Sequence, residues 1–199
     1  MNRLSIQHLC RWVCVSALMA LSSLASAQQA NDNPAEEPDT LILSDTLNYD
    51  DIKQESTFTG NVVMTRGQMT LNADTLIMRE DEEGFQYGTA TANEGKLVFI
   101  RQENPEKFEV IEARGLRAEY NGKTEEIEMI GQAIVTKYVC GKRLDNIRGE
   151  RVIYNQATSI YKAFGGPNSS AAGGRVRSVA TPGAKAEAAA AECRQNQNR

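Results

Sequence analysis

The sequence predicts an all-β, antiparallel protein. Apolar residues alternate with Thr and Asn over 58–65 and 69–74, and this period of two is typical of half-buried strands. Turn residues separate these runs, and Asn121-Gly122 is the strongest turn signal because a type I′ hairpin needs a positive φ at both central residues. No apolar stripe of period 3.6 occurs over 39–165. We therefore expect a sandwich, jelly roll or barrel-like roll.

An internal repeat divides this β region into two similar halves. Tyr49 and Tyr120 each lie eleven residues before a glycine, Gly60 and Gly131, so the offset between the halves is 71 residues. The same offset aligns FTGNVVMT with MIGQAIVT. Chance similarity of strand–turn–strand segments is the alternative, but the double match favours an architecture built by duplication.

The first 27 residues have the pattern of a secretory signal peptide. Arg3 and Arg11 precede an apolar run over 12–24, and the A-x-A sequence Ala25-Ser26-Ala27 follows. The run is shorter than the ~20 residues that a membrane span needs, so we expect cleavage rather than an uncleaved anchor. Cleavage leaves 172 residues with a net charge of −6, because the removed segment has two arginines and no acidic residue.

Composition divides the mature chain into three parts. Residues 28–38 are polar with two prolines, and we expect a flexible leader. Residues 39–182 form the β domain, with a last strand expected over 175–179. Residues 183–199 are Ala-rich and polar without an apolar period, so we expect a disordered tail with at most a transient helix.

Two of the four cysteines, Cys140 and Cys193, remain after cleavage. An exported protein meets an oxidising compartment, which permits a disulfide between them. Closing this loop would contribute about 4 kcal/mol in the chain-entropy model, and less if Cys193 lies in a disordered tail. Titration of thiols in the unfolded, unreduced protein distinguishes a disulfide from two free thiols.

The sequence contains no pattern for a catalytic, cofactor or metal site. The one histidine, His8, lies in the signal peptide, so the mature chain cannot form a Ser-His-Asp triad or a His-ligated zinc site. Gly122-Lys123-Thr124 ends like a P-loop, but Gly115 lies too far upstream and the tripeptide falls in a turn. The acidic balance argues against nucleic-acid binding. A glycan-modifying enzyme with paired carboxylates stays open, because their separation depends on the tertiary structure.

The apolar faces of the strands allow two further interpretations. They fill the core in a structural or adhesive domain that binds no ligand, or they line a groove for acyl chains, each buried methylene contributing roughly 0.8 kcal/mol. The sequence pattern alone does not distinguish a filled core from a lined groove.

The run FTGNVVMTRGQMTLNADTLIM (58–78) resembles the LptA/OstA-like family of periplasmic lipopolysaccharide-transport proteins. The resemblance covers about 39–182. Its matching residues are Ser44, Asp45, Thr59, Gly60, Asn61, Val62, Asn72, Ala73, Asp74, Glu112, Tyr120 and Gly131. Cys140 and the long tail with Cys193 depart from the family pattern.

This resemblance implies a twisted antiparallel β-jelly roll, open at both ends, that is not an enzyme and needs no cofactor. Family members stack head to tail across the periplasm, from an inner-membrane transporter complex with a membrane-anchored jelly-roll subunit to an outer-membrane translocon. Lipopolysaccharide moves along this bridge with the acyl chains of lipid A inside. An open sheet edge is a template for adding a strand, which agrees with such stacking.

The resemblance also suggests roles for individual residues. The residues expected to contact acyl chains are Phe58, Val62, Met64, Phe99, Tyr120 and Val135, with Ile42 at the entrance. The strand with Leu41 and Leu43 would pair with the inner partner or the preceding subunit. The strand with Val176 and Val179 would pair with the next subunit or the translocon. A shift of one residue in register would reverse each face.

Overall fold

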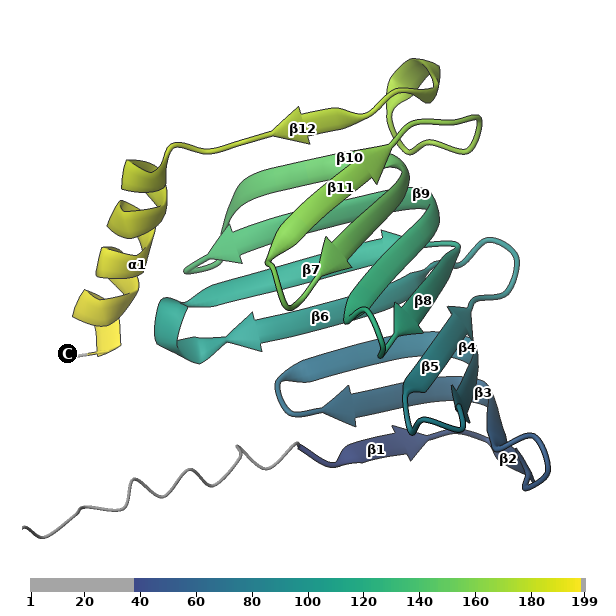
Figure 1. The fold of residues 1–199 in the computed structure, drawn as a ribbon. Helices are drawn as coiled ribbons and strands as arrows, with labels where there is room; N and C mark the ends of the chain where they lie inside the picture. Colours follow the sequence, from purple (N-terminus) through teal and green to yellow (C-terminus); the bar gives the residue numbers. More distant parts are fainter. Residues whose placement is uncertain (1–37, 198–199) are drawn as a thin grey trace, which may run out of the picture. The chain divides into compact units, whose positions relative to one another are not determined.

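The computed structural model describes residues 38–197, which form twelve β-strands, two short 3-10 helices and one α-helix (Figure 1). The first six strands are β1 (Thr40–Leu43), β2 (Thr46–Asp50), β3 (Glu55–Arg66), β4 (Met69–Glu80), β5 (Gln86–Thr91) and β6 (Val98–Asn104). The next six are β7 (Glu109–Gly115), β8 (Arg117–Asn121), β9 (Glu126–Val139), β10 (Lys142–Asn155), β11 (Ile160–Phe164) and β12 (Arg177–Val179). The helices are η1 (Pro105–Lys107), η2 (Ala172–Gly174) and α1 (Gly183–Gln197).

The antiparallel strands form two layers, and the long strands β3, β4, β9 and β10 pass through both. The first layer has the order β2, β3, β4, β5, β8, β9, β10, β11. The second layer has the order β1, β3, β4, β6, β7, β9, β10, β12. The prediction of an all-β antiparallel fold is confirmed.

Two glycine corners bend the long strands from one layer into the other. Gly60 and Asn61 both have positive φ, and the β3–β4 register shifts there, as in a β-bulge. Gly131 has the same role in β9, with a φ of +70°. A Cβ on Gly131 would lie 2.8 Å from Leu116 Cδ1. The repeated glycine of the sequence therefore marks a sharp bend that only a residue without a side chain accepts readily.

The two halves of the repeat have the same strand topology. In the first half, β1 and β2 pair with the two ends of β3, while β5 and β6 pair with the two ends of β4. In the second half, β7 and β8 pair with β9 in the same way, while β11 and β12 pair with β10. The halves join where β5 pairs with β8 and β6 pairs with β7.

The C-terminal segment differs from the sequence expectation. The last strand, β12, covers only 177–179, and the segment expected as a disordered tail forms α1. Alanine has the highest helix propensity, and Ala186, Ala189, Ala190 and Cys193 lie on one helix face at i, i+3, i+4 and i+7 spacing. Ala189 is only 2% exposed, so a stripe of small side chains packs where no apolar period was visible.

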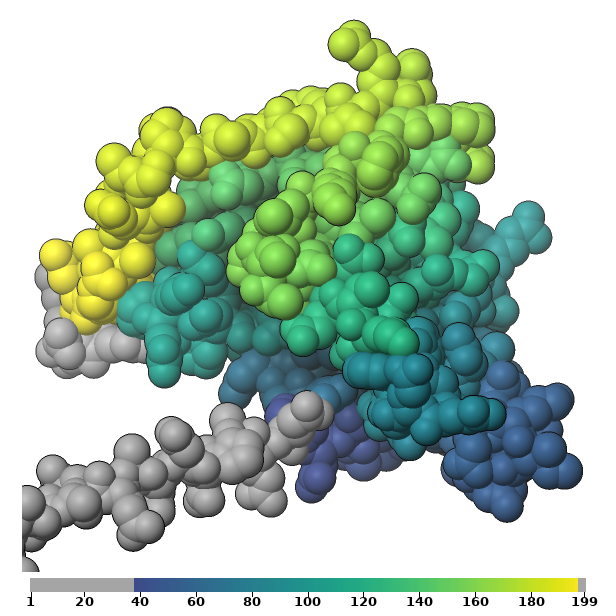
Figure 2. Space-filling view, viewed as in Figure 1, coloured from purple at the N-terminus to yellow at the C-terminus, as the bar shows by residue number. Residues whose placement is uncertain are grey.

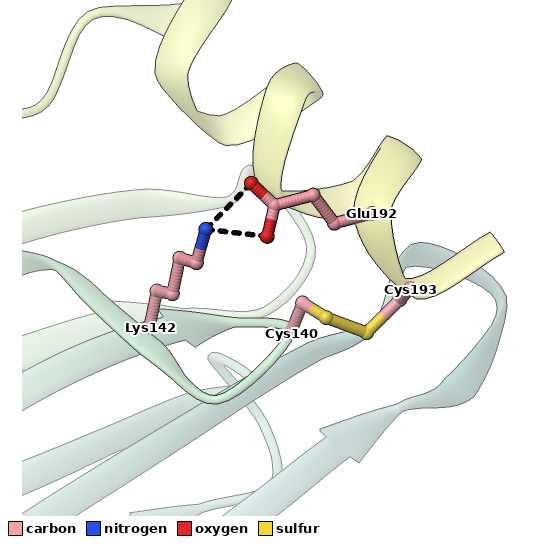
Figure 3. The surroundings of a disulfide bond; sticks show 4 residues. All are labelled: Cys140, Lys142, Glu192 and Cys193. Atoms are coloured by element: carbon pink, nitrogen blue, oxygen red, sulfur yellow. Dashed lines mark hydrogen bonds and ion pairs between the residues drawn. A yellow bond between two sulfur atoms is a disulfide. The ribbon is translucent and has the colours of Figure 1, made fainter. Parts of the chain in front are cut away.

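A disulfide joins α1 to the turn between β9 and β10, and it links Cys140 to Cys193 (Figure 3). The Cα atoms of these residues lie 5.7 Å apart. Next to it, Lys142 Nζ lies 2.7 Å from Glu192 Oε1. Figure 2 shows the segment from β12 through α1 on the surface along one side of the β domain.

The signal peptide over 1–27 and most of the leader over 28–38 lie outside the described residues. Within 38–197, no helix has both the length and the apolar character to cross a membrane.

Candidate functional site: an apolar cavity between the layers

The core lies between the two layers, where alternate residues of each strand point inward. Its largest fully buried side chains are Val62, Leu76, Val98, Met129, Val139 and Val152. The register explains this arrangement: Val62 pairs with Ala73 in the second layer, and Phe58 pairs with Leu76 in the first layer. Both layers thus turn an apolar face toward the same space.

A cavity of about 270 Å³ opens between the layers, lined mainly by the first half of the fold and bounded by Ala118, Tyr120, Ile127 and Gln156 of the second half. Its volume approaches the lower end of the ~300–1,000 Å³ of typical ligand pockets. Leu76, Met78 and Ala90 line it from the first layer, and Met64 and Leu71 line it from the second. Flexible methionine side chains adapt to irregular shapes, so this lining suits hydrocarbon of variable conformation.

Polar residues that are exposed or partly exposed complete the lining of the cavity: Thr40, Arg66, Gln102 and Gln156. Apolar walls with a polar margin suit an amphipathic ligand, with hydrocarbon inside and polar groups toward water.

The structure brings six of the seven predicted acyl-contact residues to the inner face. Met64 and Tyr120 line the cavity directly. Val62 and Val135 are buried in the core cluster, while Ile42 and Phe58 pack against it and are partly buried. Ile42 pairs with Met64, so β1 forms the outermost strand of the second-layer wall in this half.

The prediction for Phe99 is wrong, because this side chain points to the outer face. Ile100, the next residue, pairs with Leu71 and lines the cavity. Successive residues of a strand point to opposite faces. On the outer face, the Arg114 guanidinium lies 4.6 Å from the centre of the Phe99 ring and makes a cation–π contact with it.

Most apolar residues of the cavity were missing from the predicted site, among them Met69, Leu71, Leu76, Met78, Ile100 and Ile127. The signal that could have found them is the alternation itself. Met69 and Met78 belong to β4, which pairs with β3 through a tight turn at Gly67. Met64 points inward. If the alternation is continued through this turn, Met69 and Leu71 are predicted to point to the same inner face.

The second half of the fold has an aromatic pair on its inner face. Tyr154 of β10 and Tyr161 of β11 are paired residues, and their rings stack with centroids 4.4 Å apart. Burial raises the pKa of Tyr161 to about 12, with smaller contributions from Tyr154 and Glu109. Glu109 forms an ion pair with Lys137 Nζ at 2.7 Å, at inward positions of β7 and β9.

The acidic residue of the Asn72-Ala73-Asp74 motif has a structural role in the fold. Asp74 accepts hydrogen bonds from the Asn93 amide at 2.8 Å and from Lys96 Nζ at 3.0 Å. The Asn93 hydrogen bond and then the Lys96 ammonium hold the pKa of Asp74 below its usual value. In the second half, Glu150 accepts the Asn168 amide in the same way. Each carboxylate thus anchors the loop that leads from one layer to the other.

A second hollow, of about 290 Å³, lies on the outer face of the first layer and contains Glu119 and Glu128 at paired positions of β8 and β9. A glycan-modifying enzyme would need a pair of carboxylates of this kind in a hollow. Arg117 forms an ion pair with Glu119, and Arg151 forms one with Glu128. Among residues 38–197, no three His, Cys, Asp or Glu side chains gather as metal ligands.

The ends of the roll expose strands that have one partner each within the described chain: β1 and β2 at one end, β11 and β12 at the other. Leu41 and Leu43 of β1 are 59% and 58% exposed. Val179 ends β12, whereas Val176 precedes it. The predicted assembly residues therefore lie on or beside open sheet edges.

Fold and site together define a class of protein: an antiparallel β roll with an apolar cavity between two layers, suited to hold the hydrocarbon of a lipid. Comparison with protein families matches residues 41–160 to the family described as LptA/(LptD N-terminal domain) LPS transport protein. The match spans more than half of the chain, and the chain belongs to this family of transport proteins.

Among solved structures, the chain is similar to LptH from Pseudomonas aeruginosa, described as the LptA homologous periplasmic component of the conserved lipopolysaccharide transport device. The two sequences are 24% identical, the TM-score is 0.61, and the match covers 73% of this chain and 96% of LptH. This likeness establishes the fold. No curated protein gives a significant match.

Proposed function

We propose that this protein carries lipopolysaccharide across the periplasm, from the inner to the outer membrane, with acyl chains held between the two layers. The observation that supports this function most is the cavity lined by Met64, Leu71, Leu76 and Met78. Each methylene that moves from water into such a space gains roughly 0.8 kcal/mol, so a single acyl chain is held without any polar contact. The role is transport and requires no catalytic group or cofactor.

The proposed location and partners follow from the family. The signal pattern over 1–27 directs export to the periplasm. There the chain would receive lipid from the membrane-anchored jelly-roll subunit of the inner-membrane transporter complex and deliver it to the outer-membrane translocon. Open edges at β1, β2, β11 and β12 support strand addition by these partners or by another copy of the chain.

The internal repeat supports a specific register for a head-to-tail assembly. Inside the chain, the two halves join through β5–β8 and β6–β7. The same junction between copies would pair β11 with β2 and β12 with β1 of the next copy. In the second layer, Ile100 pairs with Ala113. The repeat places Ser178 of one copy at the position of Ile100. It places Ile42 of the partner subunit at the position of Ala113.

The equivalent contact in the first layer covers exposed apolar surface. Ala90 pairs with Ala118 inside the chain. Between copies, Ala163 of one copy takes the position of Ala90, and Leu47 of the partner subunit takes the position of Ala118. Leu47 is 59% exposed, whereas Ala118 is 4% exposed beside its neighbour strand. Stacking would remove Leu47 from water just as Ala118 is removed within one chain.

Lipid binding tests the carrier function. We expect the exported protein, purified and challenged with lipopolysaccharide and with phospholipid, to bind lipopolysaccharide selectively and saturably by mass spectrometry. Tyr120→Asp should reduce this binding more than it reduces the free energy of unfolding, because a carboxylate enters the cavity. Tyr120→Phe keeps the ring and is the matched control. A folded protein that binds no lipid would mean a filled core and a structural domain.

Disulfide trapping tests the head-to-tail register. Mixing Ser178→Cys protein with Ile42→Cys protein should give a disulfide-linked dimer on a non-reducing gel. Leu43→Cys is the matched control, because residue 43 points to the opposite face of β1 and should link poorly to position 178. Equal linking at positions 42 and 43, or none at either, would contradict this register.

A further inference from the structure

The two halves of the fold differ at one pair of equivalent inner positions. Leu76 pairs with Ala90 in the first half, and Val152 pairs with Ala163 in the second. Two residues further along each pairing, the first half has Met78 opposite Gly88, and the second half has Tyr154 opposite Tyr161. We call the inner space of each half of the fold a half-groove. At the same place, the first half-groove has a flexible side chain opposite a glycine, and the second has two aromatic rings.

In the first half, the small pair leaves space for a ligand. Met78 and Gly88 both line the cavity of about 270 Å³. A Cβ added at Gly88 would lie 3.1 Å from Met78 Sδ and 3.6 Å from Tyr120 Cβ. Because one additional carbon already meets the cavity wall, a phenol ring at this position would occupy the cavity itself.

In the second half, two stacked aromatic rings lie at the equivalent inner positions. The stacked rings of Tyr154 and Tyr161 lie 22° from parallel. From the second layer, Ile111 packs against the core cluster, as does Tyr161. The Glu109–Lys137 ion pair lies at neighbouring inward positions of β7 and β9. The influence of Glu109 on the Tyr161 pKa indicates that this carboxylate lies near the phenol.

We propose that the stacked Tyr154–Tyr161 pair is a gate that confines the acyl chains of a bound glycolipid to the first half of the groove. This inference rests on the proposed carrier function. Lipid moves toward β11 and β12 only when the two rings separate. The stack is favourable in itself, so the gate is closed at rest and an incoming acyl chain must displace it.

The gate coincides with the proposed junction between copies. Gly88 pairs with Tyr120 across the internal junction, and the equivalent pair between copies is Tyr161 with Tyr49 of the partner subunit. Tyr49 is 54% exposed in the single chain. A stacked assembly would therefore have three neighbouring tyrosines on the inner face at each junction, where the lipid passes from one copy to the next.

Replacing the tyrosine pair by its first-half counterpart tests the gate. The probe is hexa-acylated lipid A, and the readouts are hydrogen exchange of the full-length exported protein and bound lipid per chain. In the wild type, lipid A should slow exchange in peptides covering 69–91 and leave peptides covering 157–164, which begin beyond the cavity residue Gln156, unchanged. In Tyr154→Met/Tyr161→Gly protein, both regions should be protected. Bound lipid should then rise toward about twice the wild-type value, because two half-grooves are open.

Tyr161→Phe is the matched control, because it keeps the stacked ring and should retain the wild-type pattern. Protection of 157–164 by lipid A in the wild type would overturn the gate, and so would a folded double variant with the wild-type pattern. The wild-type measurement decides the question even if the double variant does not fold. Absence of lipid A binding in both halves of the wild type would instead refute the carrier function.

Discussion

Removing the Cys140–Cys193 disulfide should strongly destabilise the C-terminal end of the fold. The two cysteines are separated by 53 residues, and closing a loop of this length stabilises the folded state by about 4 kcal/mol in the chain-entropy model. The neighbouring Lys142–Glu192 ion pair has side chains 53% and 54% exposed. An exposed ion pair contributes only about 0–1 kcal/mol, so the disulfide dominates the attachment of α1.

The measurement compares Cys140→Ser/Cys193→Ser protein with the wild type in urea denaturation, followed by far-ultraviolet circular dichroism. We expect a loss of up to about 4 kcal/mol. Hydrogen exchange in α1 should also become fast, because an isolated helix of 15 residues is marginal in water. Glu192→Gln is the control and should lose less than about 1 kcal/mol. An unchanged unfolding midpoint, or two free thiols in the unreduced wild type, would refute this reasoning.

Two further predictions concern the corners of the long strands. Gly131→Ala should destabilise the protein by about 1–3 kcal/mol in thermal unfolding, because φ is positive and the new Cβ meets Leu116. Gly84→Ala, where φ is also positive but the space is open, should cost less, and equal losses would contradict the role of crowding. Asp74 accepts the Asn93 amide and has a lowered pKa, so its stabilising contribution is present at neutral pH. That contribution should be lost as the pH falls below about 4, and a difference in thermal midpoint between wild type and Asp74→Asn that stays constant across this range would argue against it.

The internal repeat could be predicted from the sequence because it rests on backbone requirements. Gly60 and Gly131 occupy bends with φ values of +82° and +70°, and the free energy of such a bend depends mainly on the residue at that position. The offset of 71 residues also carries the β2 range onto the β8 range. Duplication of a local pattern is visible in sequence without knowledge of distant contacts.

The faces of some strands could not be predicted from the sequence. Phe99 lies in the run Leu97-Val98-Phe99-Ile100, where every residue is apolar. A continuous apolar run has no period of two, so it does not indicate which residues point inward. The pairing of Ile100 with Leu71 sets the face, and this pairing joins strands from different hairpins.

Alternation and turn residues in the sequence by themselves determined that the chain is an antiparallel β protein with two similar halves, because those signals act between residues close along the chain. Only the tertiary structure decided that Met78 and Gly88 leave a cavity while Tyr154 and Tyr161 stack. It also decided that an alanine-rich tail becomes a helix bound to Cys140. These features depend on side chains that meet across strands and loops, and the free energy of such contacts is set by packing in space.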